Sequence, residues 1–157
     1  MTGVQTCALP ILWGAAVVLG GGATPVRADC QNVGGTVTCT GFDNDGFRSG
    51  APGLRLTVTP SSIVRNPPSV GFDGYCGDPA DQLAGPTISL GNNANLNNQG
   101  IVYGFGICGL AIDVGNNATV TNSGSVVTND AVASGIATGN RATVRNFGSI
   151  EIGRAHV

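Results

Sequence analysis

The chain has 157 residues, of which 10% are charged, and its formal net charge at pH 7 is −2. Such a chain carries neither the basic surface of a nucleic-acid-binding protein nor the polybasic patch of a lipid-binding one. With 26 glycines and 41% hydrophobic residues, the composition suits short strands joined by turns and is too apolar for a disordered tail.

The two ends of the chain differ from its interior. Residues 1–11 (MTGVQTCALPI) and 151–157 (EIGRAHV) resemble translated sequencing-library adapter. Cys7 makes the cysteine count odd, and the second segment holds the only glutamate and the only histidine of the chain, Glu151 and His156. We therefore expect both segments to be artefacts and exclude them from functional reasoning.

Residues 12–28 (LWGAAVVLGGGATPVRA) have the pattern of a shortened secretory signal peptide. The apolar run ends in Val26-Arg27-Ala28, which predicts cleavage between Ala28 and Asp29. About 12 apolar residues rich in glycine are too few to span a bilayer. The sequence therefore predicts export, with one mature domain at most beginning at Asp29.

Four cysteines follow the cleavage site, and in an oxidising compartment they are expected to form disulfides. Cys30 and Cys39 bracket a hairpin sequence with Gly34-Gly35 at its turn, so we expect these two to pair. Cys76 and Cys108 would then tie the loop at 71–86 to the first repeat. The alternative for Cys76 and Cys108 is two free, buried thiols.

Residues 29–86 are predicted to form an N-terminal cap. No repeat can be phased in residues 40–86, although Leu54–Thr59 alternates like a strand and prolines punctuate the rest. The end of a stack of strands exposes unpaired backbone groups, so a disulfide-tied cap is physically expected there.

Residues 87–150 repeat with a period of 24 residues. Copies of a Gly-Asn-containing unit begin at Gly91, Gly115 and Gly139, and apolar residues alternate with polar ones within each copy. Each unit therefore predicts about three short strands joined by tight corners, which is one coil of a β-solenoid. Three inward-facing columns are expected: Ile88/Ile112/Ile136, Leu96/Val120/Val144 and Val102/Val126/Ile150.

One asparagine recurs in each copy two residues beyond an inward apolar position. Asn98, Asn122 and Asn146 are thus predicted to face inward at a corner and to form an asparagine ladder, with each amide bonded to the next. The alternative is that asparagine merely tolerates a left-handed turn conformation before glycine.

Metal-binding residues are not clearly indicated. Asp43-Asn44-Asp45-Gly46 resembles the opening of a calcium loop, but Leu54 stands where the distal glutamate of such a loop would be. We therefore predict a plain turn there, with no metal and no cofactor.

Catalytic residues are not indicated either. No histidine base remains once the adapter-like ends are removed. Asp113 and Asp130 lie on different predicted strands, which gives no reason for their carboxylates to converge. Arg141 and Arg145 alternate outward on the last copy, as expected for a solvated face, with a sugar or anion contact as the alternative.

Tyr103 and Phe105 interrupt the repeat on the face opposite the inward columns. They are expected either to pack under the loop at 71–86 or to form a small exposed aromatic patch. Packing under the loop is favoured, because Cys108 is predicted to be tied to that loop.

A resemblance to a known family rests on three features in order. Asp29-Cys30 directly follows the cleavage site, Thr36–Gly41 reads TVTCTG, and repeats of the Ala-Thr-Val-Thr-Asn-Ser-Gly-Ser-Val kind come after it. Together they resemble the passenger domain of a bacterial autotransporter over residues 12–150. The resemblance implies a right-handed parallel β-helix on a Gram-negative cell surface, exported via the periplasm and outer membrane.

The resemblance also implies a function without catalysis. Autotransporter passengers are usually adhesins or related surface structures, so the expected partners are host-cell surfaces or glycans, and not nucleic acid. The alternatives are a β-helical polysaccharide lyase or glycosidase, and a passive surface spacer. We expect the outer-membrane translocation barrel to be missing from this fragment, and the native coil to stop after Ile150, leaving an edge open to self-association.

Overall fold

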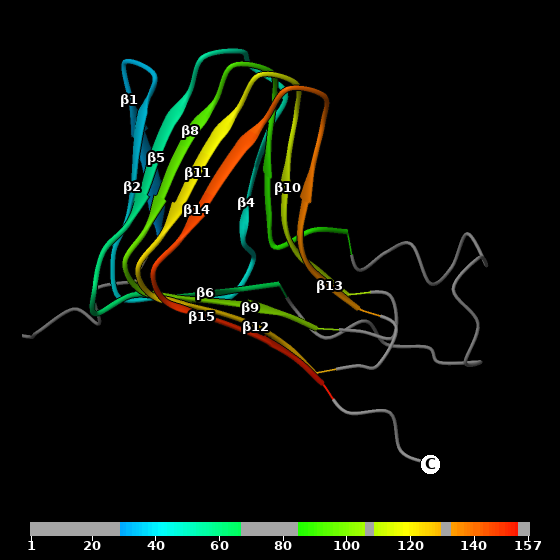
Figure 1. Cartoon of the computed structure of the whole chain (residues 1–157). Coiled ribbons are helices and arrows are strands. Elements are labelled where there is room, and N and C mark those ends of the chain that lie inside the picture. Colours follow the sequence, from blue (N-terminus) through cyan, green and yellow to red (C-terminus); the bar gives the residue numbers. More distant parts are fainter. Residues whose placement is uncertain (1–28, 67–84, 106–108, 130–132, 154–157) are drawn as a thin grey trace, which may run out of the picture.

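The computed structural model describes residues 29–66, 85–105, 109–129 and 133–153. In these residues the chain winds as a right-handed parallel β-helix whose coils stack along one axis (Figure 1). Its strands form three sheets, which we call sheets A, B and C. The predicted all-β, parallel β-helix fold is therefore confirmed. Within the same residues, no helix is long and apolar enough to cross a membrane.

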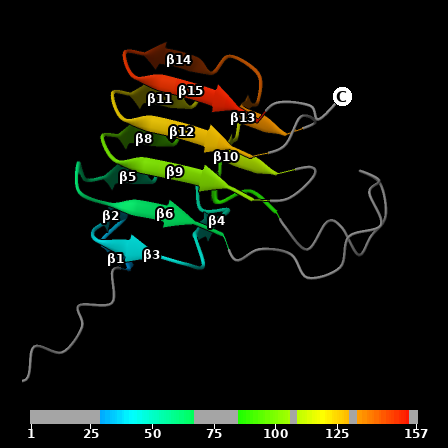
Figure 2. The same ribbon diagram turned by 90° about the horizontal axis from the view of Figure 1, so that it is seen from below.

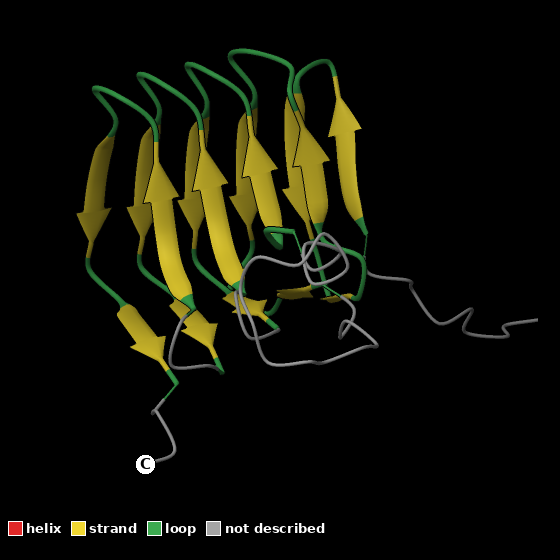
Figure 3. Ribbon diagram, turned by 90° about the vertical axis from the view of Figure 1, so that its right-hand side faces the viewer, coloured by secondary structure: helices red, strands yellow, loops and turns green. Residues whose placement is uncertain are grey.

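Each sheet collects one short strand from successive coils, as the side view in Figure 3 shows. Sheet A contains β1 (Cys30–Val33), β2 (Thr36–Cys39), β5 (Arg55–Val58), β8 (Asn95–Asn98), β11 (Thr119–Asn122) and β14 (Thr143–Asn146). Sheet B contains β3 (Phe42–Asp43), β6 (Ile63–Arg65), β9 (Ile101–Gly104), β12 (Ser125–Thr128) and β15 (Ser149–Ile152). Sheet C contains β4 (Phe47–Ser49), β7 (Ile88–Leu90), β10 (Leu110–Val114) and β13 (Ser134–Thr138).

The strands pair in the register that the 24-residue repeat predicts. Val120 lies opposite Leu96 on one side and Val144 on the other, and the columns through Ile112 and Val126 are built in the same way. Alternate residues of a strand point to opposite faces. Every second residue of these strands therefore enters the core, and most of these residues are apolar. The fully buried members of the three columns are Ile88, Leu96, Val102, Ile112, Val120 and Val126.

The β-helix begins earlier than the sequence predicts. Val37 and Leu56 continue the column of Leu96 towards the N-terminus, and both are buried. Residues 36–66 thus belong to two parallel coils and not to an irregular cap. The spacing in this column is 19 residues from Val37 to Leu56 and 40 from Leu56 to Leu96, so no 24-residue period reveals these coils.

The predicted cap is confined to β1 among the described residues. This strand runs antiparallel to β2, with Gly34 and Gly35 at the turn in left-handed conformations (φ 58° and 82°). A disulfide joins Cys30 to Cys39, as predicted. Residue types that accept positive φ are needed at such a two-residue turn, which explains the glycine pair.

A connection between sheets B and C interrupts the second coil between β6 and β7. Its residues 67–84 lie outside the described part. Asn66, the last described residue before this gap, is hydrogen-bonded to residues on the other side of it. The Asn66 amide donates to Gly85 O (3.1 Å) and accepts from Thr87 Oγ1 (2.9 Å) and from Phe105 N–H (3.0 Å). Asn66 is itself buried. These hydrogen bonds therefore connect the end of β6 to the start of β7 and to the end of β9.

The glycines at the A–B corners are required by close approach. A Cβ added to Gly124 would lie 2.0 Å from Gly100 O, and one added to Gly148 would lie 1.9 Å from Gly124 O. These carbonyl oxygens accept hydrogen bonds from Ser125 and Ser149 of the next coil. The repeated glycine therefore allows neighbouring coils to stack at hydrogen-bonding distance.

The inward columns end in the last coil at Ile136, Val144 and Ile150. All three occupy the predicted inward columns, and each pairs with its counterpart in the preceding coil. Ile136 is nevertheless only half-buried, and the side chains of Val144 and Ile150 are 43% and 39% exposed. These three residues thus lie in the predicted columns but are not fully buried. The physical reason is that β13, β14 and β15 are the outermost strands of their sheets among the described residues, so nothing there covers them from the other side.

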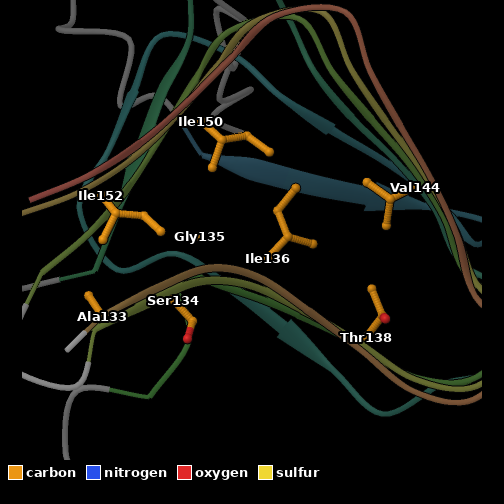
Figure 4. A pocket seen from close by; sticks show the side chains of 8 residues that line it. All are labelled: Ala133, Ser134, Gly135, Ile136, Thr138, Val144, Ile150 and Ile152. Carbon is orange, nitrogen blue, oxygen red and sulfur yellow. The ribbon is translucent and has the colours of Figure 1, made fainter. Parts of the chain in front are cut away.

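The uncovered side chains line a hollow of about 420 Å³ at this end of the β-helix. Figure 4 shows Ile136, Val144 and Ile150 around it, together with Ile152 and other residues of β13. β15 continues to Ile152, two residues into the segment that resembles adapter. Self-association through this end stays a prediction.

The assignment of inward and outward positions can be tested on one strand, β11. Val120→Asp should lower the free energy of unfolding by about 3–5 kcal/mol, because it buries a carboxylate without a partner. Thr121→Asp changes the neighbouring, half-exposed position and should cost less than about 0.5 kcal/mol. Urea unfolding of both variants measures the difference, and equal stabilities would contradict the assignment.

The close approach at the glycine corners gives a second prediction. Gly124→Ala should destabilise the chain by about 3 kcal/mol, since its Cβ would overlap a backbone oxygen that cannot rotate away. Gly50→Ala is the matched control, because a Cβ at Gly50 meets no atom within 4 Å. Thermal and urea unfolding should show Gly50→Ala within about 0.5 kcal/mol of the parent. Similar effects of the two substitutions would show that coil stacking does not set the need for Gly124.

Candidate functional site

The structure places Asn98, Asn122 and Asn146 in one column of sheet A. Asn98 Nδ2 donates to Asn122 Oδ1 and Asn122 Nδ2 donates to Asn146 Oδ1, both at 2.7 Å. The same two amides also donate to the backbone oxygens of Ser125 and Ser149. Asn98 and Asn122 are buried and Asn146 is exposed at the last coil, and the bonds between them join successive coils, so their role here is structural.

A second row of asparagines, which the sequence analysis did not identify, lies at the C–A corners. Asn92 Oδ1 accepts from Asn116 N–H (2.8 Å), and Asn116 Oδ1 accepts from Asn140 N–H (2.7 Å). The recurring Gly-Asn pair was the available signal. The residue that follows is left-handed in each copy, namely Asn93, Asn117 and Arg141 (φ 59°, 56° and 59°). The ladder and the left-handed turn are thus filled by different asparagines.

Several other residues named in the sequence analysis either lie outside the described structure or are not brought together by it. Ala28, Cys76, Cys108 and Asp130 lie outside the described residues. Asp113 lies on β10 with Ser89 and Ala137 as its lateral neighbours, so sheet C brings no second carboxylate beside it there. Arg141 and Arg145 are exposed on the last coil, and Asp29 is exposed just before β1.

The outer face of sheet B carries an aromatic and apolar surface around one arginine. We call it the Arg65 surface; it consists of Phe42, Ile63, Arg65, Ile101, Tyr103 and Phe105. Its strands β3, β6 and β9 lie side by side in Figure 2. Strand register aligns Phe42, Ile63 and Ile101 in one row and places Tyr103 beside Arg65 in the next.

Contacts within the Arg65 surface hold its side chains in place. The guanidinium carbon of Arg65 lies 4.5 Å from the ring centroid of Phe42 and 5.7 Å from that of Phe105, which are cation–π distances. Arg65 Nε also donates to Asn44 Oδ1. The rings of Tyr103 and Phe105 lie 4.4 Å apart. The guanidinium is therefore oriented by two rings and an amide.

Part of this surface remains open to solvent. Phe42 is 47% exposed and Ile101 is 37% exposed. Tyr103 and Phe105 are half-buried against each other, while most of the loop predicted to cover them lies outside the described residues. Sequence reasoning missed Phe42 and Arg65, because their place beside Tyr103 depends on the two coils that the 24-residue period does not reveal.

Three carboxylates gather at the N-terminal end of the β-helix. One oxygen from each of Asp29, Asp43 and Asp45 lies within 4.8 Å of the other two. Asp43 is 1% exposed, and its Oδ1 accepts the N–H groups of Asp45 (3.0 Å) and Gly46 (2.9 Å). Its Oδ2 is buried without a hydrogen-bond partner among the described residues. These side chains are the ones in the described structure that could hold a cation.

Burial changes the acidity of this cluster. Desolvation raises the pKa of Asp43 to about 6, and the neighbouring negative charge of Asp45 adds to the rise. The two backbone N–H groups that Asp43 accepts act in the opposite direction. Without a cation, the cluster therefore favours a protonated Asp43 near pH 5.

Comparisons with models of protein families, with curated protein sequences and with solved structures find no match to this chain.

The raised pKa of Asp43 predicts how stability depends on pH. The ordinary pKa of an aspartate is 3.8, so between pH 3.8 and about 6 the folded chain binds more protons at Asp43 than the unfolded chain does. In the presence of a chelator, the contribution of Asp43 should be complete below pH 3.8 and lost as pH rises through about 6. Urea unfolding of the parent between pH 4 and 7 measures this loss.

Two variants serve as controls for this measurement. Asp43→Asn keeps the acceptor for the two backbone N–H groups but has no proton to lose, so its stability should fall less over the same range. Asp113→Asn should follow the parent profile. Parallel profiles for the parent and Asp43→Asn would contradict the raised pKa.

Proposed function

We propose that this chain belongs to an exported, non-enzymatic surface protein of the autotransporter passenger type, and that it binds glycans or other host-surface groups. The proposal is supported by the regular β-helix closed at its first coil by the Cys30–Cys39 disulfide, together with the signal-like residues 12–28. Disulfides persist in oxidising compartments, which agrees with export.

The Arg65 surface is the observation that carries the binding part of the proposal. Polar residues occupy most outward positions of the repeat, whereas here rings and aliphatic side chains gather around a cation on a regular sheet. Apolar groups exposed together on a rigid face commonly mark interaction sites. A guanidinium held by two rings has lost freedom before any ligand arrives, which lowers the entropic cost of binding.

The chemistry of the Arg65 surface indicates the class of ligand. The arginine can donate hydrogen bonds to a carboxylate or sulfate, while the rings and Ile101 offer an apolar face. An acidic glycan combines an anionic group with the apolar face of a sugar ring. We therefore propose acidic glycans of the host surface as the ligand class, and binding by an open flank in place of a closed pocket.

Binding by the full, oxidised chain can be measured on an array of neutral and acidic glycans and on cultured host cells. Arg65→Ala should weaken binding at least tenfold, and Tyr103→Ala should weaken it to a smaller extent. Arg55→Ala is the matched control, because it removes the same charge from an exposed position on sheet A. It should bind as the parent does.

The outcomes separate the competing functions. Equal binding by Arg65→Ala and Arg55→Ala would remove the Arg65 surface as the binding site. No binding to any glycan or cell would favour a passive spacer. Depolymerisation of a polysaccharide by the parent would favour the lyase or glycosidase alternative.

A further inference from the structure

The inward column of sheet B contains one position that departs from the pattern of the others. Register places Asp43 beside Val64, and the same column continues through Val102 and Val126 to Ile150. Every other member of this column is aliphatic, whereas the first coil presents a carboxylate. A buried carboxylate is costly unless something compensates its charge.

The hydrogen bonds around Asp43 leave that compensation incomplete. Oδ1 receives two backbone N–H groups, but Oδ2 is buried and accepts nothing from the described residues. The nearest acidic groups, Asp29 and Asp45, add negative charge. Arg65, a cation on the neighbouring strand β6, gives its Nε–H to Asn44 and stacks on the outer ring of Phe42.

We propose that Asp29, Asp43 and Asp45 form a calcium-binding site that ties the chain before β1 to the first coil. Oxygen ligands lie about 2.3–2.6 Å from Ca²⁺, so two ligands on opposite sides of the ion are about 4.6–5.2 Å apart. Mutual separations within 4.8 Å therefore allow the three carboxylates to share one ion. Carboxylate oxygens are hard ligands, and water can complete the six to eight positions that Ca²⁺ takes.

Local backbone geometry explains how the three residues meet. Asp43 accepts the N–H of Asp45, which closes a tight turn. This turn places the carboxylate of Asp45 close to that of Asp43. Gly46 has φ +69°, which lets the chain leave that turn towards β4. Asp29 arrives from the other direction, because the disulfide hairpin β1–β2 holds the start of the described chain beside the first coil.

The position of the third carboxylate explains why the sequence analysis predicted a plain turn at Asp43–Gly46 and not a calcium site. A calcium loop of the familiar helical type takes its last ligand from a downstream glutamate, and Leu54 stands there. In this fold the third carboxylate comes from upstream of the turn, across a hairpin. The proposal is independent of the proposed glycan-binding function, since none of its ligands belongs to the Arg65 surface.

The site can be tested by calorimetric titration of the full, oxidised and chelator-treated chain with CaCl2 at pH 7.5, and by thermal melts at the same pH. The expected result is one Ca²⁺ per chain and a saturable rise of several degrees in Tm. MgCl2 should produce a smaller rise, because Mg²⁺ requires shorter, near-octahedral ligand contacts.

Matched variants distinguish the site from non-specific binding. Asp45→Asn changes an exposed side chain, so the fold should persist while Ca²⁺ binding weakens at least tenfold. Asp43→Asn, which keeps the turn acceptor, should abolish the rise in Tm. Asp113→Asn removes a distant carboxylate on sheet C and should respond to CaCl2 as the parent does. Absence of a saturable response in the parent, or an unchanged response in Asp45→Asn and Asp43→Asn, would overturn the proposal.

Discussion

The structure depends on in-register pairing of parallel strands between successive coils. Neighbouring strands lie about 4.8 Å apart, so each side chain in a column touches the corresponding side chain of the next coil. A residue type can therefore recur along a column only if it accepts a copy of itself as neighbour. Aliphatic residues meet this condition in the core, and asparagine meets it at Asn98, Asn122 and Asn146, where each amide is both donor and acceptor.

Departures from this rule coincide with the candidate functional residues. An ionised carboxylate cannot donate to a copy of itself, and Asp43 is followed in its column by Val64 and not by a second carboxylate. On the outer face, the row of Phe42 continues in the later coils with Ser125 and Ser149, and the row of Arg65 and Tyr103 continues with Val127 and Glu151. Uniform positions stabilise the stack, and the non-repeating ones carry the chemistry that we propose for this protein.

The sequence was sufficient for the fold where the repeat is regular. The alternation in Thr119–Asn122 and the constant spacing from Leu96 to Val144 define strand, face and register together. It was insufficient where coil length changes: Val37 and Leu56 belong to the same column, but only their burial and pairing reveal it. The Arg65 surface takes Phe42, Ile63 and Arg65 from these early coils, and the Asp43 cluster lies at the first of them. Both sites join residues from coils of unequal length or across a hairpin, so periodicity could not predict them.

The hydrogen bonds of Asn66 have a consequence for how this scaffold can change. Connections from sheet A to sheet B hold two to four residues, and those from C to A hold four or five, whereas one B-to-C connection holds 22. Asn66 is hydrogen-bonded to Gly85, Thr87 and Phe105, so the two ends of this connection are held together by residues outside residues 67–84. Lengthening a loop that is already closed adds little entropic cost. The B–C edge is therefore the place at which new sequence can be inserted without altering the register of the stack, and it borders the end of β9 that bears Tyr103.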